Sequence, residues 1–427
     1  VKGSDKDLTT PQELKEQGTQ ALLLASKWYQ QFILTFPRDE QTPELTYRLG
    51  EALFEASQYA ESINAFEYYA YEHLQPNTYI TTAHPKAAEA AYGAIIAYEK
   101  IQLFPEVPSD FLLMQGLTAP MFTQDNNQQL SWLDKQLMAQ ENFVNTFADD
   151  ARASDILYSS MQQLFTLKRY DFAIAAAEKL LDWQPKIQSD KHLASYLVIG
   201  HSQFALQQYA LGESTYDQIM QLLPDNDRRR LDIRDRLAAS IYKQGEQNVS
   251  NNYLPLAVND FLRVLAKTPK SAIRVNAQYD AATYLLQMQE WQQGIDLFKD
   301  FRQRFPNNKL TINIQEQLIL AYQQNENWQQ AADELLVLHQ DNPQSEEGRQ
   351  ALYVAAQYLN KIDNRQKALE AYRTYAHSYG KPFAEANEAR FIMSEFYLKS
   401  DEANKRRFWL NKLIQADKQA LISADIE

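Results

Sequence analysis

Residues 291–306 read WQQGIDLFKDFRQRFP and contain the clearest copy of a pattern that recurs along the chain. Gly294 stands twelve residues before Pro306, and Phe298 and Phe301 follow the glycine by four and seven residues. These offsets place the glycine and both rings on one face of a helix. A small residue on that face lets a second helix approach closely, and a proline ends the helix. The stretch therefore predicts the second helix of a tightly packed helix pair.

The same arrangement recurs along the chain. Five prolines follow such helices at spacings of 39, 45, 37 and 37 residues, and a small residue stands twelve positions before each of them. The prolines are Pro185, Pro224, Pro269, Pro306 and Pro343. The small residues are Ala173, Gly212, Ala257, Gly294 and Ala331, and Ala25, Ser62 and Ala368 take the same place in three further helices. A period of this length is typical of stacked helical repeats.

The turns between paired helices have their own signal. In five units an aromatic residue stands three positions before the small residue, where we expect it to fill the turn; these are Tyr59, Tyr170, Tyr209, Trp291 and Trp328. The unit at 225–269 is longer than the others. We expect its stretch GEQNVSNN, residues 245–252, to lengthen the turn between its two helices.

This pattern resembles the tetratricopeptide repeat (TPR) family, in which a small residue, an aromatic residue four positions later and a terminal proline mark the second helix. The glycine of the family's first helix is present as Gly50 and Gly200. Other residues take its place elsewhere, namely Met161, Ala282, Ile319 and Ala356. The resemblance implies an all-α fold, a right-handed superhelical solenoid of antiparallel helix pairs.

The repeat covers nearly the whole chain. We expect one continuous solenoid of about nine helix pairs over 11–420, after a polar lead-in at 1–10 and before a tail at 421–427. An insertion at 101–127 interrupts it and contains Phe111 and Phe122. Long loops in compact domains are often functional, so this one either offers its apolar side chains to a partner or folds back over the solenoid. Because the chain begins with valine, we expect a fragment or mature form of a longer protein.

Composition argues against several classes of function. The net charge of −13 repels a nucleic-acid backbone, and no run of eighteen apolar residues is present to span a membrane. There are no cysteines, and no two of the six histidines share the helical spacing that would aim them at one metal. Phosphate-binding and nucleophile-elbow motifs are also missing from the sequence. We therefore expect a protein that is not an enzyme and that has no catalytic residues, cofactor or metal.

The candidate binding residues follow from the family resemblance, which implies that first helices line a concave wall. Four tyrosines share one position on that wall, and tyrosine is enriched where proteins dock. With the neighbouring residues and the insertion, the candidates are Tyr47, Arg48, Glu51, Tyr158, Gln162, His201, Tyr279, Tyr353, Phe111 and Phe122. The tyrosines could equally serve packing between neighbouring pairs, and both possibilities remain open.

The function that we expect is a non-catalytic protein-protein interaction scaffold, which binds other proteins or peptides in its concave groove. The stretches RQRFPNNK (302–309) and NTFADDAR (145–152) resemble repeats of bacterial envelope proteins. That resemblance implies partners in a cell-envelope complex and a periplasmic location, with a cytoplasmic location as the alternative. An accessory subunit of an enzyme complex, or a glycan-binding helical repeat protein that uses its tryptophans, is the alternative function.

Overall fold

The computed structural model of the protein describes residues 11–74, 82–104 and 131–424, and every regular element among them is a helix. The chain divides into two compact units, Val1–Gln208 and Tyr209–Glu427, which we call unit 1 and unit 2. The predicted all-α class is confirmed. Whether the helices form one continuous array across the division stays a prediction.

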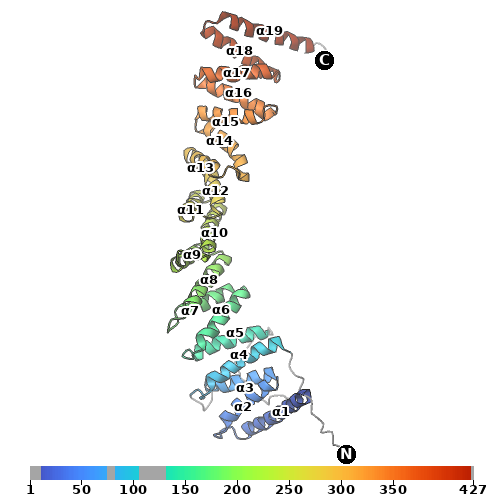
Figure 1. Ribbon diagram of the computed structural model, residues 1–427, viewed down its shortest axis with the longest axis vertical. Helices are drawn as coiled ribbons and strands as arrows, with labels where there is room; N and C mark the ends of the chain where they lie inside the picture. Colours follow the sequence, from blue (N-terminus) through green and yellow to red (C-terminus); the bar gives the residue numbers. More distant parts are fainter. Residues whose placement is uncertain (1–10, 75–81, 105–130, 425–427) are drawn as a thin grey trace, which may run out of the picture. The chain divides into compact units, whose positions relative to one another are not determined.

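Unit 1 begins with one long helix, after which two-helix repeats follow (Figure 1). In each repeat we call the earlier helix the first helix and the later one the second helix. The helices are α1 (Pro11–Thr35), α2 (Thr42–Glu55), α3 (Tyr59–Tyr71), the short 3₁₀ helix η1 (Glu72–Leu74), α4 (Ala87–Leu103), α5 (Trp132–Thr146), α6 (Ala153–Thr166), α7 (Tyr170–Leu181) and α8 (Ser189–Ala205). Residues 101–103 of the predicted insertion thus belong to α4, and most of the rest of it lies outside the described residues.

Unit 2 continues the alternation of first and second helices (Figure 1). Its helices are α9 (Tyr209–Leu222), α10 (Arg229–Ser250), α11 (Leu254–Lys267), α12 (Arg274–Gln287), α13 (Trp291–Arg304), the 3₁₀ helix η3 (Lys309–Asn313), α14 (Ile314–Gln324), α15 (Trp328–Asp341), α16 (Glu346–Lys361), α17 (Arg365–Ser378), α18 (Phe383–Lys399) and α19 (Ala403–Ala424). Within each unit, every helix packs against its neighbours in sequence.

All described first helices except α4 end in one recurring turn. After α2, the amide of Ser57 donates to the Phe54 carbonyl at 2.9 Å and the amide of Gln58 donates to the Leu53 carbonyl at 2.8 Å. This pair of bonds is the Schellman motif, whose central residue adopts a positive φ. The same φ, between 57° and 64°, recurs at Ser57, Lys168, Gln207, Asn252, Gln289, Glu326, Asp363 and Asp401. In seven of these turns, the predicted small residue of the second helix stands five positions after the residue with positive φ. The turn therefore keeps the register of the repeat.

The predicted small residues lie where helices meet. Ala173, Ala257, Ala331 and Ala368 are fully buried, as are most of the large residues four and seven positions after them. Phe66 shows the consequence, because its ring lies between two glycines. A Cβ added to Gly50 of α2 would come within 2.5 Å of that ring, and one added to Gly93 of α4 within 3.0 Å. Three successive helices can therefore approach one phenylalanine.

Two sequence predictions about register are wrong. In α1 the buried face carries Ser26, Gln30 and Ile33, one position beyond the predicted Ala25, because the buried residues there are polar as well as apolar. Residues 245–252 do not lengthen a turn, since α10 stays helical through Ser250.

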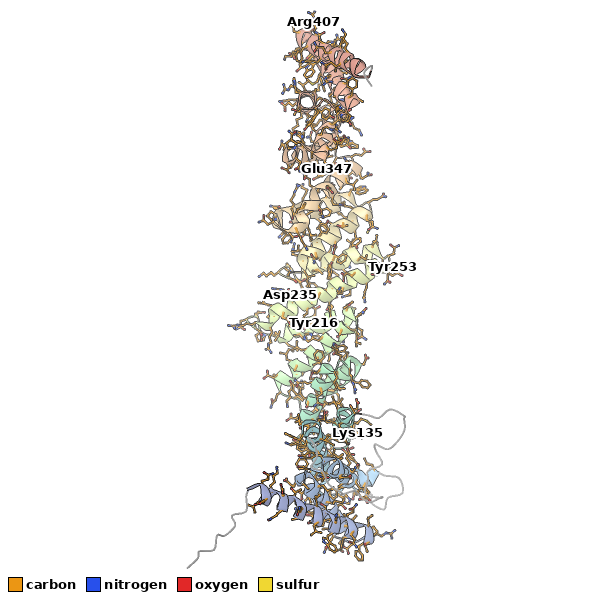
Figure 2. All side chains as sticks on the ribbon, turned by 90° about the vertical axis from the view of Figure 1, so that its right-hand side faces the viewer. Lys135, Tyr216, Asp235, Tyr253, Glu347 and Arg407 are labelled. Carbon is orange, nitrogen blue, oxygen red and sulfur yellow. The ribbon has the colours of Figure 1, made fainter. Side chains whose placement is uncertain are left out.

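The extra length of the 225–269 unit lies in α10 itself. Gly245 stands against Phe261, with 2.6 Å from an added Cβ to the ring, and so takes the place of the family glycine. The turn that follows has the same Schellman bond, from the Tyr253 amide to the Asn248 carbonyl. The Tyr253 side chain projects from this turn and is 58% exposed, whereas Tyr216 is fully buried (Figure 2). The unit therefore keeps the standard turn after a longer first helix.

Candidate protein-interaction site

The four predicted tyrosines all lie on first helices, and the rings of Tyr47, Tyr279 and Tyr353 pack against aromatic rings of the following second helix. In unit 1 the Tyr47 ring centroid is 5.5 Å from that of Tyr69. In unit 2 the Tyr279 ring is 5.5 Å from Phe298. Tyr158 is partly buried, and its hydroxyl accepts a hydrogen bond from Gln162 at 2.7 Å. These rings fill the joints between helices, which is the packing role that the sequence left open.

Tyr353 is the clearest case of packing. It is 5% exposed, and its hydroxyl donates to Glu388 of the next first helix at 2.6 Å. Burial, followed by the bond to Glu388, raises its pKa. Sequence reasoning missed a fifth member of the row, Tyr242, which donates to Asp280 at 2.5 Å. Tyr242 stands fifteen residues before Ala257, as Tyr353 stands before Ala368, so the repeat period could have found it.

The remaining predicted residues lie nearer the surface. Arg48 is exposed and bonds Glu44 at 3.0 Å and Glu51 at 3.1 Å. Lys86, at the start of α4, reaches the same Glu44 at 3.1 Å. Gln162 is exposed, and His201 is partly buried with its ring 6.3 Å from that of Phe165. Phe111 and Phe122 lie outside the described residues.

Unit 1 also contains a cavity that sequence reasoning did not predict. It has a volume of about 350 Å³ and lies between α5, α6 and α7, and we call it the α5–α7 cavity. Phe172 and Met138, which line it, are 67% and 38% exposed, so the cavity opens to the surface. Its apolar lining consists of Leu137, Met138 and Val144 of α5, Leu157 and Leu164 of α6, and Phe172, Ala175 and Ala176 of α7.

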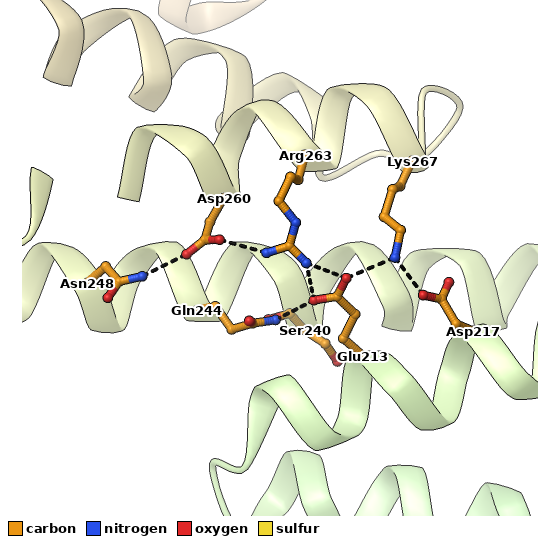
Figure 3. Close-up of polar contacts among 8 residues, drawn as sticks. All are labelled: Glu213, Asp217, Ser240, Gln244, Asn248, Asp260, Arg263 and Lys267. Carbon is orange, nitrogen blue, oxygen red and sulfur yellow. Dashed lines mark hydrogen bonds and ion pairs between the residues drawn. The ribbon is translucent and has the colours of Figure 1, made fainter. Parts of the chain in front are cut away.

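Unit 2 shows what usually joins successive second helices. Glu213 of α9 is 7% exposed and accepts hydrogen bonds from Arg263 and, at 2.9 Å, from Lys267, both on α11 (Figure 3). Gln244 of α10 donates to the same carboxylate at 2.8 Å. Burial raises the pKa of Glu213, but the bonds from Arg263, Gln244 and Lys267 outweigh it and leave the pKa below its ordinary value. Ion pairs between Glu213 and the two basic residues thus join α9 to α11.

A second charged bridge joins α13 to α15. Arg302 donates two parallel hydrogen bonds to Glu334, at 2.8 and 2.9 Å. Bidentate pairs of this kind are both specific and strong.

Between its two ends, the α5–α7 cavity is lined by apolar residues at positions where other second helices carry bridging charges. The positions of α5 and α13 can be compared because both helices end in the same way. The Phe147 amide donates to the Phe143 carbonyl after α5, and the Phe305 amide donates to the Phe301 carbonyl after α13. In this register Val144 stands where α13 has Arg302. Counted from the small residue, Ala176 stands where α15 has Glu334. In the alignment of α5 with α13, Leu137 stands one position after the equivalent of Gly294, as Glu213 stands one position after Gly212 in α9. Short apolar side chains therefore leave open the space that ion pairs fill elsewhere.

Polar contacts close the two ends of the cavity. At one end Arg169 bonds Asp134 at 2.5 Å, and at the other Lys179 donates to Asn145 at 2.6 Å. Hydrogen bonds from the Ser131 hydroxyl and from Arg169 hold the pKa of Asp134 below its ordinary value. Ser131 also caps α5 through a reciprocal capping box with Asp134, which fixes that end of the helix. The cavity is thus a short apolar depression with rigid ends.

Comparisons with known proteins add the following. No protein-family model and no curated protein matches the sequence. Among solved structures, MamA AMB-1 is 14% identical over 44% of this chain and 93% of its own, with a TM-score of 0.28. The C-terminal part of a TPR repeat-containing protein from Cytophaga hutchinsonii is 13% identical over 61% of this chain and 95% of its own, with a TM-score of 0.26. YrrB, described as a TPR protein with an unusual peptide-binding site, is 13% identical over 50% and 98%, with a TM-score of 0.26.

The resemblance to TPR proteins rests on the repeat pattern of the sequence and on its succession of helix pairs. Among the residues that the structure describes, no three histidine, aspartate or glutamate side chains gather as a metal site would require. No helix in the described ranges combines the length and the apolar character needed to cross a membrane.

Proposed function

We propose that the protein is a non-catalytic scaffold and that the α5–α7 cavity is a point at which it binds partner proteins. The observation that carries the proposal is the replacement of bridging charges by Leu137, Val144 and Ala176 between α5 and α7. An apolar depression on the surface favours contact with another molecule, because leaving it in water forgoes the free energy of burial. Helices hold its walls in place, so little ordering opposes binding.

We further propose a bacterial cell-envelope complex as the setting and the periplasm as the compartment, with the cytoplasm as the alternative. The support is the similarity of residues 302–309 and 145–152 to envelope repeats, together with the acidic net charge, which disfavours nucleic acid as a partner. For the alternative of glycan binding, a tryptophan would have to offer a free face. Trp328 does not, because Lys361 lies 3.5 Å from the centre of its ring, whereas Trp28 of α1 is 64% exposed and keeps this alternative open.

The first-helix residues remain a second candidate surface for the same kind of partner. Substitution of Tyr353 is a poor test of that surface, since removal of a buried ring would destabilise unit 2 whatever it binds. Arg48→Ala and Gln162→Ala are better, because both side chains are exposed. Loss of a purified partner's binding with these variants would assign the partner to the first-helix surface.

The cavity is tested by placing a photo-crosslinking amino acid at Met138 and, as a control, at Leu256, which is 56% exposed on α11. Crosslinks formed in cells identify a protein, which is then purified and titrated into the full chain by calorimetry. We expect saturable binding that Phe172→Ala weakens and Leu256→Ala leaves unchanged. If no protein crosslinked at Met138 binds as a purified component, the scaffold proposal for this cavity is wrong.

A further inference from the structure

We infer that the α5–α7 cavity takes a short peptide segment that inserts one large apolar side chain and carries a lysine or arginine beside it, opposite Glu141. The inference rests on the proposed function and deepens it by stating the chemistry of the partner. It follows from the size of the cavity, from one buried polar atom and from the charges on the rim.

The size of the cavity limits the partner to a short segment. Its volume of about 350 Å³ lies near the lower end of ligand pockets, which range from about 300 to 1,000 Å³. The lining of α5 from Leu137 to Val144 spans roughly 10 Å at about 1.5 Å per helical residue. About three residues of extended chain cover that length. The cavity therefore has room for one large side chain. A longer partner, such as a helix, would also insert only one side chain into it.

Gln140 supplies a polar anchor inside this apolar lining. The residue is 1% exposed and lines the cavity, and its Oε1 atom has no hydrogen-bond partner among the described residues. A buried acceptor without a donor is destabilising, and a ligand whose N–H group reaches that atom relieves the penalty. A peptide backbone amide or an indole N–H can be that donor, which a purely hydrocarbon ligand cannot.

Glu141 sets the charge of the partner. It is exposed on the rim and forms no hydrogen bond or ion pair with any residue in the described ranges, whereas the other rim carboxylate, Asp134, is held by Arg169. The rim cation Lys179 is held by Asn145 at one end of the cavity, so a basic side chain would be placed beside Glu141 and not at that end. The chain as a whole carries a net charge of −13, so an acidic segment is repelled on approach and a basic one is attracted. A cationic side chain next to the apolar anchor therefore fits this rim.

The probe for the test is a phage-displayed library of random twelve-residue peptides, selected against the full chain. We expect the enriched peptides to share an aromatic or large aliphatic residue adjacent to lysine or arginine. Synthetic copies should bind the wild-type chain in fluorescence polarisation and lose about 30-fold in affinity on Phe172→Ala, as truncation at the centre of an interface typically does. Leu211→Ala and Leu256→Ala are matched controls, because these exposed residues stand just before the small residue of α9 and α11, as Phe172 does in α7.

Two further variants separate anchor from charge. Val144→Arg combined with Ala176→Glu rebuilds the bridge seen between Arg302 and Glu334, and it should abolish binding by filling the cavity. Glu141→Lys should weaken the basic peptides two- to fivefold, as expected for an exposed pair. The same variant should bind peptides whose basic residue is replaced by glutamate more tightly than the wild-type chain does. Circular dichroism checks that each variant is folded. If the double variant is not folded, Phe172→Ala still tests the cavity, because Phe172 is exposed and its removal leaves the core intact.

The outcomes distinguish this inference from the proposed function. Peptides that lack a basic residue but lose binding on Phe172→Ala would overturn the inference and leave the scaffold proposal standing. Enriched peptides that bind Phe172→Ala and wild type equally, or the absence of any enriched peptide, would overturn both. Enrichment of the apolar-basic motif with reversal on Glu141→Lys would establish the inference.

Discussion

Glu67 offers a direct measurement of the energetics of unit 1. It lies in α3, is 1% exposed, and accepts a hydrogen bond from the Tyr98 hydroxyl at 3.0 Å, while its Oε2 atom has no partner among the described residues. Burial raises its pKa from 4.5 to about 8, against smaller opposing effects of Tyr98 and Lys135. The native protein therefore holds this carboxyl protonated at neutral pH.

The magnitude follows from proton linkage. Below pH 4.5 the carboxyl is protonated in both the folded and the unfolded chain, so its contribution to stability is fully present. As the pH rises from 4.5 to 8 the unfolded chain releases a proton that the folded chain retains, and stability is lost. A difference of 3.5 between the two pKa values corresponds to about 5 kcal/mol in the free energy of unfolding, at about 1.4 kcal/mol per unit.

Glu67→Gln removes this proton release and keeps an acceptor for Tyr98. We expect the variant to match the wild-type chain near pH 4.5 and to exceed its stability increasingly up to pH 8. Pulse proteolysis in urea, with peptides of α3 and α4 followed by mass spectrometry, measures the free energy in this unit. Glu55→Gln, at an exposed site in α2, is the control and should leave the pH profile unchanged. A flat wild-type profile, or a variant whose stability falls in parallel with it, would refute the reasoning.

Four further substitutions test the packing, the charged bridge and the turn of the repeat by urea denaturation. Gly50→Ala should cost about 1–3 kcal/mol by crowding Phe66, whereas Gly18→Ala, which meets nothing within 4 Å, should stabilise α1 by about 0.5–1 kcal/mol; equal effects would contradict the close approach. Glu213→Ala should cost about 1–3 kcal/mol in unit 2, and an unchanged midpoint would show that the bridge between α9 and α11 adds nothing. Gln289→Gly should raise stability by about 0.5–1 kcal/mol, since glycine adopts the positive φ of that turn more readily, and a loss would contradict the assigned conformation.

Much of the fold could be predicted from the sequence because the repeat depends on side-chain size at fixed spacing. Ala173 and Ala257 are buried as expected, and aromatic residues such as Trp291 and Trp328 open their helices. The register failed in α1, where Ser26 instead of Ala25 faces the neighbouring helix. Ala25 and Ser26 are both small and adjacent, so side-chain size alone does not predict which of them faces the neighbouring helix when the rest of that face is partly polar.

The cavity could not be predicted from the sequence. It results from side chains of α5 and α7 that are too short to fill the space between the two helices, and the width of that space is known only from the structure. The run of Ala175, Ala176 and Ala177 in α7 was a visible signal, but alanine is also the best helix former and reads as ordinary helix. The predicted tyrosines lie on first helices, and the packing of the neighbouring helices determines how far Tyr353 is enclosed. Their part in binding stays a prediction.

The repeated Schellman turn has a consequence for engineering. Eight different sites adopt one backbone conformation with serine, lysine, glutamine, asparagine, glutamate or aspartate at the centre, so the geometry comes from the helices on either side and not from the identity of the central residue. Segments cut at this turn, each containing a second helix and the next first helix, should therefore be interchangeable as cassettes. Chimeras that move α7 and α8 together would carry the cavity's α7 side into another array.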